Sequence, residues 1–174
     1  MPKLNQLAPD FSGVTAYHKG AFKKISLADY KGKWLALFFY PRDFTFVCPT
    51  ELKAFAEHQA DFAKLNAEVL AASTDSAWSH KAWFEQLLPQ VEYPVLADTS
   101  LNISRLYGVL EETDGSADRG LFLIDPEQKI RYILISDGSV GRSVTETLRV
   151  LEALQTGELC PADWHKGQTT LGKG

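Results

Sequence analysis

Residues 34–40 (WLALFFY) are the longest uninterrupted apolar stretch of the chain, and Gly32 and Pro41 bound it. A short apolar and aromatic run between such residues is typical of a buried central β-strand. A loop then leads to Cys48 and Pro49, and proline is favoured in the first turn of a helix. The stretch therefore predicts a strand, a loop and a helix, with Cys48 at the point where the helix begins.

The flanking sequence continues this alternation of strands and helices. Apolar residues at helical spacing extend the helix from Cys48 to about Leu65. The other elements expected are a hairpin within 11–27, a strand at 69–72, a helix through Ala82, Trp83 and Leu87, a strand at 95–97, a short helix at 101–107, a hairpin of 121–124 and 130–135, and a helix at 144–154 that stops at Gly157. This order predicts an α/β fold, a mixed sheet with helices on both faces. In such sheets the functional site lies beyond the carboxyl ends of the central strands, where Cys48 is expected.

The composition limits the classes of function. With 174 residues the chain predicts one domain, 1–174, in which a tail begins at about residue 157. The net charge of −4 disfavours a nucleic-acid partner, and no apolar run is long enough for a membrane span or a secretory signal. We therefore expect a soluble, cytoplasmic protein. The sequence has no phosphate-binding glycine motif and no zinc-ligand spacing, so no cofactor or metal is expected.

The two cysteines, Cys48 and Cys160, lie 112 residues apart in the sequence (160 − 48). At the start of a helix, backbone N–H groups and the helix dipole favour the thiolate form of Cys48. The Thr45 hydroxyl could bond both the sulfur and an incoming oxygen, and Pro41 would shield the sulfur from bulk water. The alternative is an inert buried cysteine, the commonest role of a lone cysteine.

The residues around Cys48 decide between these alternatives. Residues 41–48 (PRDFTFVC) match the Pro-x-x-x-Thr-x-x-Cys motif of the peroxiredoxins, and residues 38–52 resemble the typical two-cysteine subgroup nearly letter for letter. Further similar segments are STD at 73–75, SHKAW at 79–83, ADRG at 117–120, VGRSV at 140–144 and GELCP at 157–161. Over almost its whole length the chain resembles bacterial alkyl hydroperoxide reductase catalytic subunits, which implies a thioredoxin-like fold.

The resemblance implies a thiol-dependent peroxidase that reduces hydrogen peroxide and alkyl hydroperoxides. Cys48 attacks the peroxide and becomes a sulfenic acid, and Cys160 of the partner subunit condenses with it to form an intersubunit disulfide. An external reductant, such as thioredoxin, a flavoprotein reductase or a small disulfide-reducing protein, then reopens the disulfide. The resemblance also implies a homodimer that assembles into a ring, with a decamer expected.

Five further residues receive roles from the resemblance. Thr45 and Arg119 hold the peroxide oxygens and Cys48, while Pro41 screens the sulfenic acid. Glu51 and Arg142 match the positions of an ionic network that orients Arg119. Without the resemblance, Arg119 would more often be a surface salt-bridge partner, and Glu51 could equally be a solvated acid of the first helical turn.

Two other functions are compatible with this fold. A thioredoxin-like disulfide oxidoreductase needs a second thiol in the first turn of the helix, and Glu51 stands at that position. A ring-forming holdase chaperone would not explain Thr45, Cys48 and Arg119 together. The sequence therefore favours the peroxidase.

The remaining residues with reactive or large side chains receive simpler interpretations. Trp78 and Trp83 are expected to pack rather than to take part in chemistry. His80 and His165 have no partner visible in the sequence and are expected at the surface. Cys160, in a tail rich in Gly and Thr, suits a mobile thiol that travels to its partner.

Peroxiredoxins that excess peroxide inactivates easily carry a Gly-Gly-Leu-Gly insert and a C-terminal Tyr-Phe helix. Residues 110–119 (LEETDGSADR) contain no such insert, and the sequence ends at Gly174 without Tyr-Phe. We therefore expect fast disulfide formation by Cys160 and little conversion of Cys48 to sulfinic acid.

Overall fold

The apolar run at 34–40 forms β3 (Trp34–Phe39), an interior strand of the sheet whose six residues are all buried. Its neighbours are β4 (Ala67–Ser73), which runs parallel to it, and β6 (Arg119–Ile124), which runs antiparallel. The predicted buried strand is therefore confirmed, and the sheet is mixed as expected.

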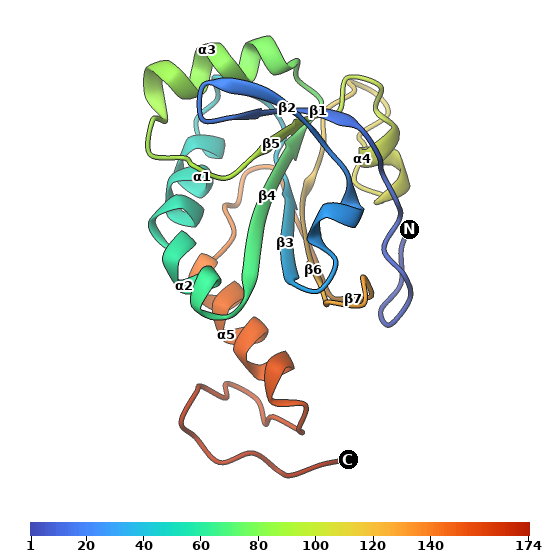
Figure 1. Cartoon of the computed structure of the whole chain (residues 1–174), viewed down its shortest axis with the longest axis vertical. Helices are drawn as coiled ribbons and strands as arrows, with labels where there is room; N and C mark the ends of the chain where they lie inside the picture. Colours follow the sequence, from blue (N-terminus) through green and yellow to red (C-terminus); the bar gives the residue numbers. More distant parts are fainter. The chain divides into compact units, whose positions relative to one another are not determined.

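The computed structural model describes residues 1–174, which divide into two compact units, Met1–Arg142 and Ser143–Gly174. In the first unit seven strands lie in the order β2-β1-β5-β4-β3-β6-β7 (Figure 1). Its other elements are β1 (Val14–His18), β2 (Ala21–Ile25), the 3₁₀-helix η1 (Leu27–Tyr30), α1 (Cys48–Glu57), α2 (Gln59–Lys64), α3 (Ala77–Leu87), β5 (Val95–Ala97), α4 (Asn102–Leu106) and β7 (Ile130–Ser136). The antiparallel pairs β1–β2 and β6–β7 confirm the two predicted hairpins.

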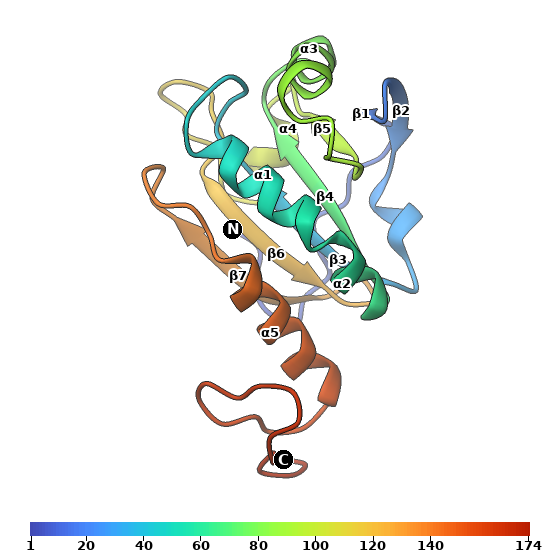
Figure 2. The same ribbon diagram turned by 90° about the vertical axis from the view of Figure 1, so that its left-hand side faces the viewer.

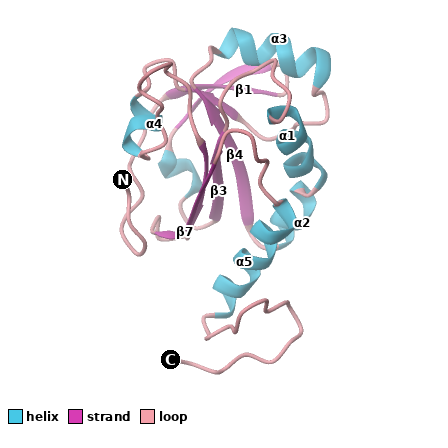
Figure 3. Ribbon diagram, turned by 180° about the vertical axis from the view of Figure 1, so that it is seen from behind, coloured by secondary structure: helices cyan, strands magenta, loops and turns pink.

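Helices cover both faces of this sheet, as the order of elements predicts. Figures 1 and 3 show α1 and α2 on one side of the strands and α4 on the other. Figure 2 shows α1 in front of β4, β3 and β6. The start of α1 therefore lies at the end of the sheet where β3 finishes.

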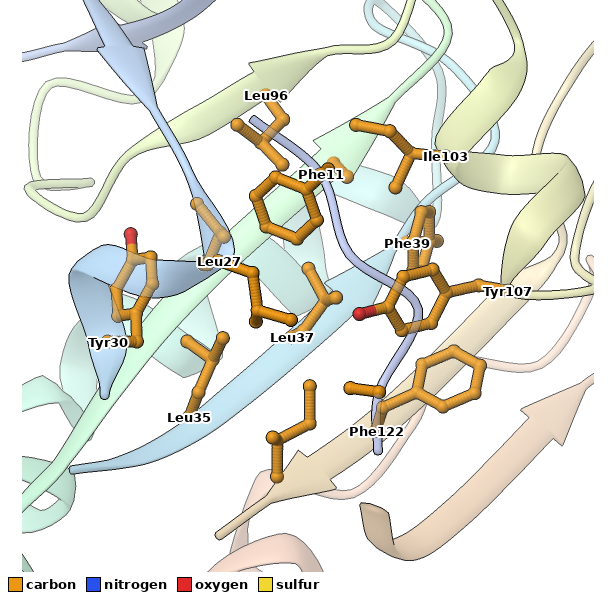
Figure 4. Close-up of a cluster of buried hydrophobic side chains, with 14 of the residues drawn as sticks. Phe11, Leu27, Tyr30, Leu35, Leu37, Phe39, Leu96, Ile103, Tyr107 and Phe122 are labelled. Carbon is orange, nitrogen blue, oxygen red and sulfur yellow. The ribbon is translucent and has the colours of Figure 1, made fainter. Parts of the chain in front are cut away.

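Each face of β3 builds its own core, because successive side chains of a strand point to opposite sides. On one face, Leu37 and Phe39 join a buried cluster that includes Tyr107 and Phe122 (Figure 4). On the other face, Phe38 stacks on a phenylalanine of α1 with 4.2 Å between the ring centroids. Burying one side chain of this size contributes about 1.5–3 kcal/mol to the free energy of unfolding. This packing holds the helix that begins at Cys48 against the sheet.

The helix expected from Cys48 to about Leu65 is two helices, and this part of the prediction is wrong. The break falls at His58, whose backbone leaves helical geometry with φ −100° and ψ 8°. The His58 ring lies 3.0 Å from the Asp61 carboxylate in the first turn of α2. The apolar spacing continues across the break, so the pattern alone did not reveal it.

The second unit begins with α5 (Val144–Thr156), which ends at Gly157 with a left-handed φ of +65°. Glycine adopts this conformation without steric cost, so it stops the helix where the sequence predicts. None of the helices in the chain combines the length and the hydropathy that a membrane span requires.

Candidate active site

Cys48 is the first residue of α1 and is only 1% exposed. Pro49 follows it in the first helical turn, where its missing N–H removes no hydrogen bond. Because Cys48 is the first residue of the helix, its sulfur stands at the positive end of the α1 dipole. The position expected for Cys48, one loop beyond β3, is confirmed.

Arg119 is the side chain that faces this sulfur. It is the first residue of β6 and 3% exposed, and its Nη1 lies 3.5 Å from Cys48 Sγ. The same Nη1 donates to Glu51 Oε2 at 2.6 Å, and Nε donates to the Gly138 carbonyl at 2.9 Å. Nη2 donates no hydrogen bond to the protein. The guanidinium is therefore fixed on two sides and keeps donors free for a further ligand.

Glu51 links Arg119 to Arg142 in the interior. Its Oε1 accepts from the Arg142 backbone N at 2.8 Å and from Nε at 2.7 Å, while Oε2 accepts from Nη2 at 3.0 Å. Arg142 also lies over the Phe38 ring, 5.2 Å from its centroid. Burial alone would raise the pKa of Glu51, but hydrogen bonds and charge from Arg142, with the charge of Arg119, hold it below its ordinary value. Glu51 is therefore a buried carboxylate and not a solvated acid.

Two guanidinium groups share the single Glu51 carboxylate, so the cluster carries one positive charge in excess. In a water-poor site such a charge stabilises a negative charge that develops nearby. The three residues that the sequence associates with an ionic network thus lie together, beside Cys48.

Thr45 differs from its expected geometry. Its hydroxyl donates to the Arg42 carbonyl at 2.9 Å, and the predicted hydrogen bond to the Cys48 sulfur is not formed in the structure. The oxygen retains lone pairs with which it can accept a hydrogen bond from a ligand. Pro41 is half-buried at the start of the same loop.

The prediction that His80 lies at the surface is wrong, because its ring is fully buried. Nδ1 lies 2.8 Å from Asp43 Oδ2, and Nε2 lies 3.1 Å from the Leu96 carbonyl oxygen. Asp43 also accepts hydrogen bonds from Tyr40 and Ser79, each at 2.7 Å. This cluster anchors the loop between β3 and Cys48.

The positions of the apolar residues in α3 could have predicted that His80 is buried. His80 is three and four residues from Trp83 and Phe84, which are both 1% exposed, so the three side chains share one face of the helix. Trp83 packs as predicted. Trp78 does not, because it lies on the outer face, is 70% exposed and contacts only the edge of Phe22 among the rings.

Cys160 belongs to the second unit. Its sulfur lies 3.7 Å from the Ala153 carbonyl oxygen and 3.5 Å from Thr156 Oγ1, both at the end of α5. Leu159 donates to the Gly172 carbonyl and accepts from the Leu171 N–H, each at 2.8 Å, so the segment after Cys160 is a closed loop. His165 is exposed, as the sequence predicts.

Both cysteines are free thiols in the structure. No group of three or more His, Cys, Asp or Glu side chains is arranged to hold a metal ion. A buried cysteine at a helix start, facing an arginine that a carboxylate orients, is an arrangement for thiol redox chemistry.

Comparison with known proteins names the class. Residues 4–133 match the model of the AhpC/TSA family. The chain therefore belongs to the AhpC/TSA family, and it is a peroxiredoxin, an enzyme that reduces peroxides with a thiol.

The similarity covers nearly the full length of the chain. Peroxiredoxin 2 of Drosophila melanogaster is 52% identical over 98% of this chain and 92% of its own length. A thioredoxin peroxidase of Trypanosoma brucei rhodesiense is 49% identical over 97% of this chain and 89% of its own length. The crystal structure of Enterococcus faecalis AhpC is 42% identical, with a TM-score of 0.88, and the match covers 92% of this chain and all of that one.

Proposed function

We propose that Cys48 is the residue that attacks the peroxide. The observation that carries this proposal is the 3.5 Å contact between Arg119 Nη1 and Cys48 Sγ inside a buried charge cluster. The Cys48 thiolate attacks one peroxide oxygen, so that an S–O bond forms as the O–O bond breaks. The sulfur is oxidised to a sulfenic acid, and the leaving oxygen takes a proton and departs as water or alcohol.

Arg119 stabilises the charge that develops on the leaving oxygen. Its Nη2 is free of protein partners, and Glu51 and Gly138 hold the guanidinium in place. A fixed donor of this kind accounts for about 10²–10³ in rate in other enzymes. Thr45 accepts a hydrogen bond from the bound peroxide, and Pro41 limits the access of water to the sulfenic acid.

We further propose that Cys160 of the partner subunit completes the reaction. Its thiol attacks the sulfenic sulfur of Cys48, so that an S–S bond forms, the S–O bond breaks and water leaves. A reducing dithiol protein of the thioredoxin or flavoprotein-reductase class then takes the disulfide and restores both thiols. Support comes from the two free cysteines and from the absence of any other thiol in the chain.

We propose that the enzyme is a homodimer that assembles into a ring, and we expect ten subunits in the ring. The loop before Cys48 leaves Phe46 94% exposed and Phe44 56% exposed, and Trp78 on α3 is 70% exposed. Apolar side chains open to this degree supply surface that a second copy of the chain can cover. Two free thiols that must be reduced at rest support a cytoplasmic location.

Single replacements of the two cysteines test these roles. Cys48→Ser should abolish peroxide consumption, whereas Cys160→Ser should complete one turnover and then stop when a protein dithiol is the only reductant. After one equivalent of peroxide, non-reducing gels should contain a covalent dimer that disappears in Cys160→Ser. An oxidised species that runs only as a monomer would contradict the intersubunit disulfide.

A further inference from the structure

The proposed disulfide between Cys48 and Cys160 of the partner subunit requires the start of α1 to move. Cys48 is 1% exposed, so the protein covers its sulfur almost completely. A disulfide brings the two Cβ atoms to within about 3.5–4.5 Å of each other, and a thiol of another subunit cannot come this close to a covered sulfur. The first turn of α1 must therefore leave its place before the disulfide forms.

One attachment of this turn is the side chain of Glu51, three residues after Cys48. Its carboxylate accepts hydrogen bonds from Arg119 Nη1 at 2.6 Å and from Arg142 Nε at 2.7 Å. An extended chain spans at most about 3.3–3.6 Å per residue, so the Cys48 backbone can reach about 10 Å from that of Glu51 while Glu51 stays in place. How far the sulfur travels therefore depends on the residue at which α1 remains attached.

A second attachment lies directly after Glu51 in the chain. Tyr93 belongs to the loop between α3 and β5, which passes beside α1 (Figure 1). Its Oη donates to the Leu52 carbonyl at 2.7 Å, and both residues are buried, Tyr93 with 2% and Leu52 with 0% of its surface exposed. In an α-helix the same carbonyl also accepts from the N–H of the residue four positions later, here Ala56. The Leu52 carbonyl is therefore bonded both within the helix and from the neighbouring loop.

Tyr93 is also part of the packing that supports the buried charges. Its ring packs against Phe38 in an edge-to-face arrangement, with 5.9 Å between the ring centroids. Phe38 in turn stacks on Phe55 of α1 and lies under the Arg142 guanidinium. Burial raises the pKa of Tyr93, and the charge of Glu51 raises it further. The hydroxyl therefore keeps its proton and remains a hydrogen-bond donor to the helix.

We propose that Tyr93 is a positioning residue that sets where the opening of α1 stops. This inference rests on the proposed function, which requires the Cys48 sulfur to leave the interior. When the first turn opens, the hydrogen bond from Tyr93 holds the helix from Leu52 onward, and the Glu51 side chain stays within reach of both guanidinium groups. Opening of residues 48–51 removes the acceptors of the N–H groups of residues 52–55. The N–H of Ala56 is then the first that keeps its partner.

Hydrogen exchange of the full-length protein, resolved to single amides by mass spectrometry, tests the proposal. The exchange rates are measured in the reduced form and in the disulfide form that one equivalent of peroxide produces. Tyr93→Phe removes only the hydroxyl and keeps the ring that packs on Phe38. Tyr107→Phe is the matched control, because Tyr107 is also fully buried and donates to a backbone carbonyl, that of Pro9 at 2.9 Å, in the cluster on the opposite face of β3.

In the wild-type protein we expect the amides of residues 52–55 to exchange faster in the disulfide form than in the reduced form, and the Ala56 amide to exchange at the same rate in both. In Tyr93→Phe the Ala56 amide should exchange about threefold to tenfold faster in the disulfide form than in the reduced form, because the opening then passes Leu52. Tyr107→Phe should give the wild-type pattern.

Equal acceleration of the Ala56 amide in both forms of Tyr93→Phe would mean that the hydroxyl only stabilises the fold, and it would overturn the proposal. The same applies if Tyr107→Phe gives the pattern expected for Tyr93→Phe. The wild-type protein tests the stop without any variant, since faster Ala56 exchange in its disulfide form would show that the opening already passes Leu52. Failure of the proposed function has a different signature: non-reducing gels would then show no covalent dimer after peroxide, and the inference falls with it.

Discussion

Replacing Arg119 with alanine should separate stabilisation of the leaving oxygen from the reactivity of the sulfur. The variant keeps most of the buried network, because Glu51 retains its three hydrogen bonds to Arg142 at 2.7, 2.8 and 3.0 Å. It loses the donor that lies 3.5 Å from Cys48 Sγ. The variant should therefore still fold, but it should reduce peroxide more slowly.

The expected magnitude follows from what the guanidinium does in each reaction. Reduction of a peroxide places negative charge on a leaving oxygen, and loss of one fixed donor to such a charge slows other enzymes about 10²–10³-fold. Alkylation by iodoacetamide attacks carbon and releases iodide, so the same donor contributes little. We expect Arg119→Ala to lose about 10²–10³ in the rate with hydrogen peroxide and less than about tenfold in the rate of alkylation.

Stopped-flow oxidation and timed alkylation of Cys48 give the two rates in the same buffer. Arg119→Lys is the matched control, because it keeps the charge but not the paired donors, and its loss with peroxide should be intermediate. If Arg119→Ala slows both reactions by the same factor, the guanidinium acts only through the sulfur, and the role proposed for it at the leaving oxygen is wrong.

Three further predictions concern stability and inactivation. The pKa of Glu51 in the folded protein lies below the ordinary 4.5, so its contribution to the free energy of unfolding is present above about pH 4.5 and lost as the pH falls through the folded value. Glu51→Gln should thus lower the free energy of unfolding by about 3 kcal/mol at pH 7. Denaturation curves measured at decreasing pH should show the stability of the variant and of the wild-type protein becoming equal. If the difference between the two proteins is the same at every pH, the charge of Glu51 is not what stabilises the fold. His80→Leu should lower the free energy of unfolding by about 2–3 kcal/mol, and the double variant His80→Leu with Asp43→Ala should lose less than the sum of the losses in the two single variants. If the two losses simply add, the His80 and Asp43 side chains are not coupled. Turnover in rising peroxide, with mass spectrometry of the Cys48 peptide, should yield disulfide rather than sulfinic acid, and early sulfinic acid with intact Cys160 would contradict the expected resistance.

Local patterns determined the elements that build the site. The apolar run at 34–40 specifies β3 because only a strand buried on both faces suits so many consecutive apolar residues. Pro49 specifies the start of α1, since proline fits the first helical turn and no later one. The position of Cys48 at the edge of the sheet follows from these two features alone.

The tertiary structure decided which side chains meet at that edge. Arg119 is 71 residues from Cys48 and 68 from Glu51 in the sequence. The antiparallel pairing of β6 with β3 is part of the fold that places the three side chains next to one another. No local pattern encodes such a pairing. Without the family resemblance, Arg119 would have been interpreted as a surface residue.

Only the structure shows which partners the polar side chains bond and which isolated polar residues are buried. The Thr45 hydroxyl bonds a carbonyl rather than the sulfur, and His80 is buried because Asp43 and a backbone carbonyl satisfy both of its ring nitrogens. The sequence shows which residues can donate or accept hydrogen bonds, but distance and angle in the folded chain determine which pairs form. A polar side chain is tolerated in the interior only when such a partner is present. These quantities exist only once the chain is folded.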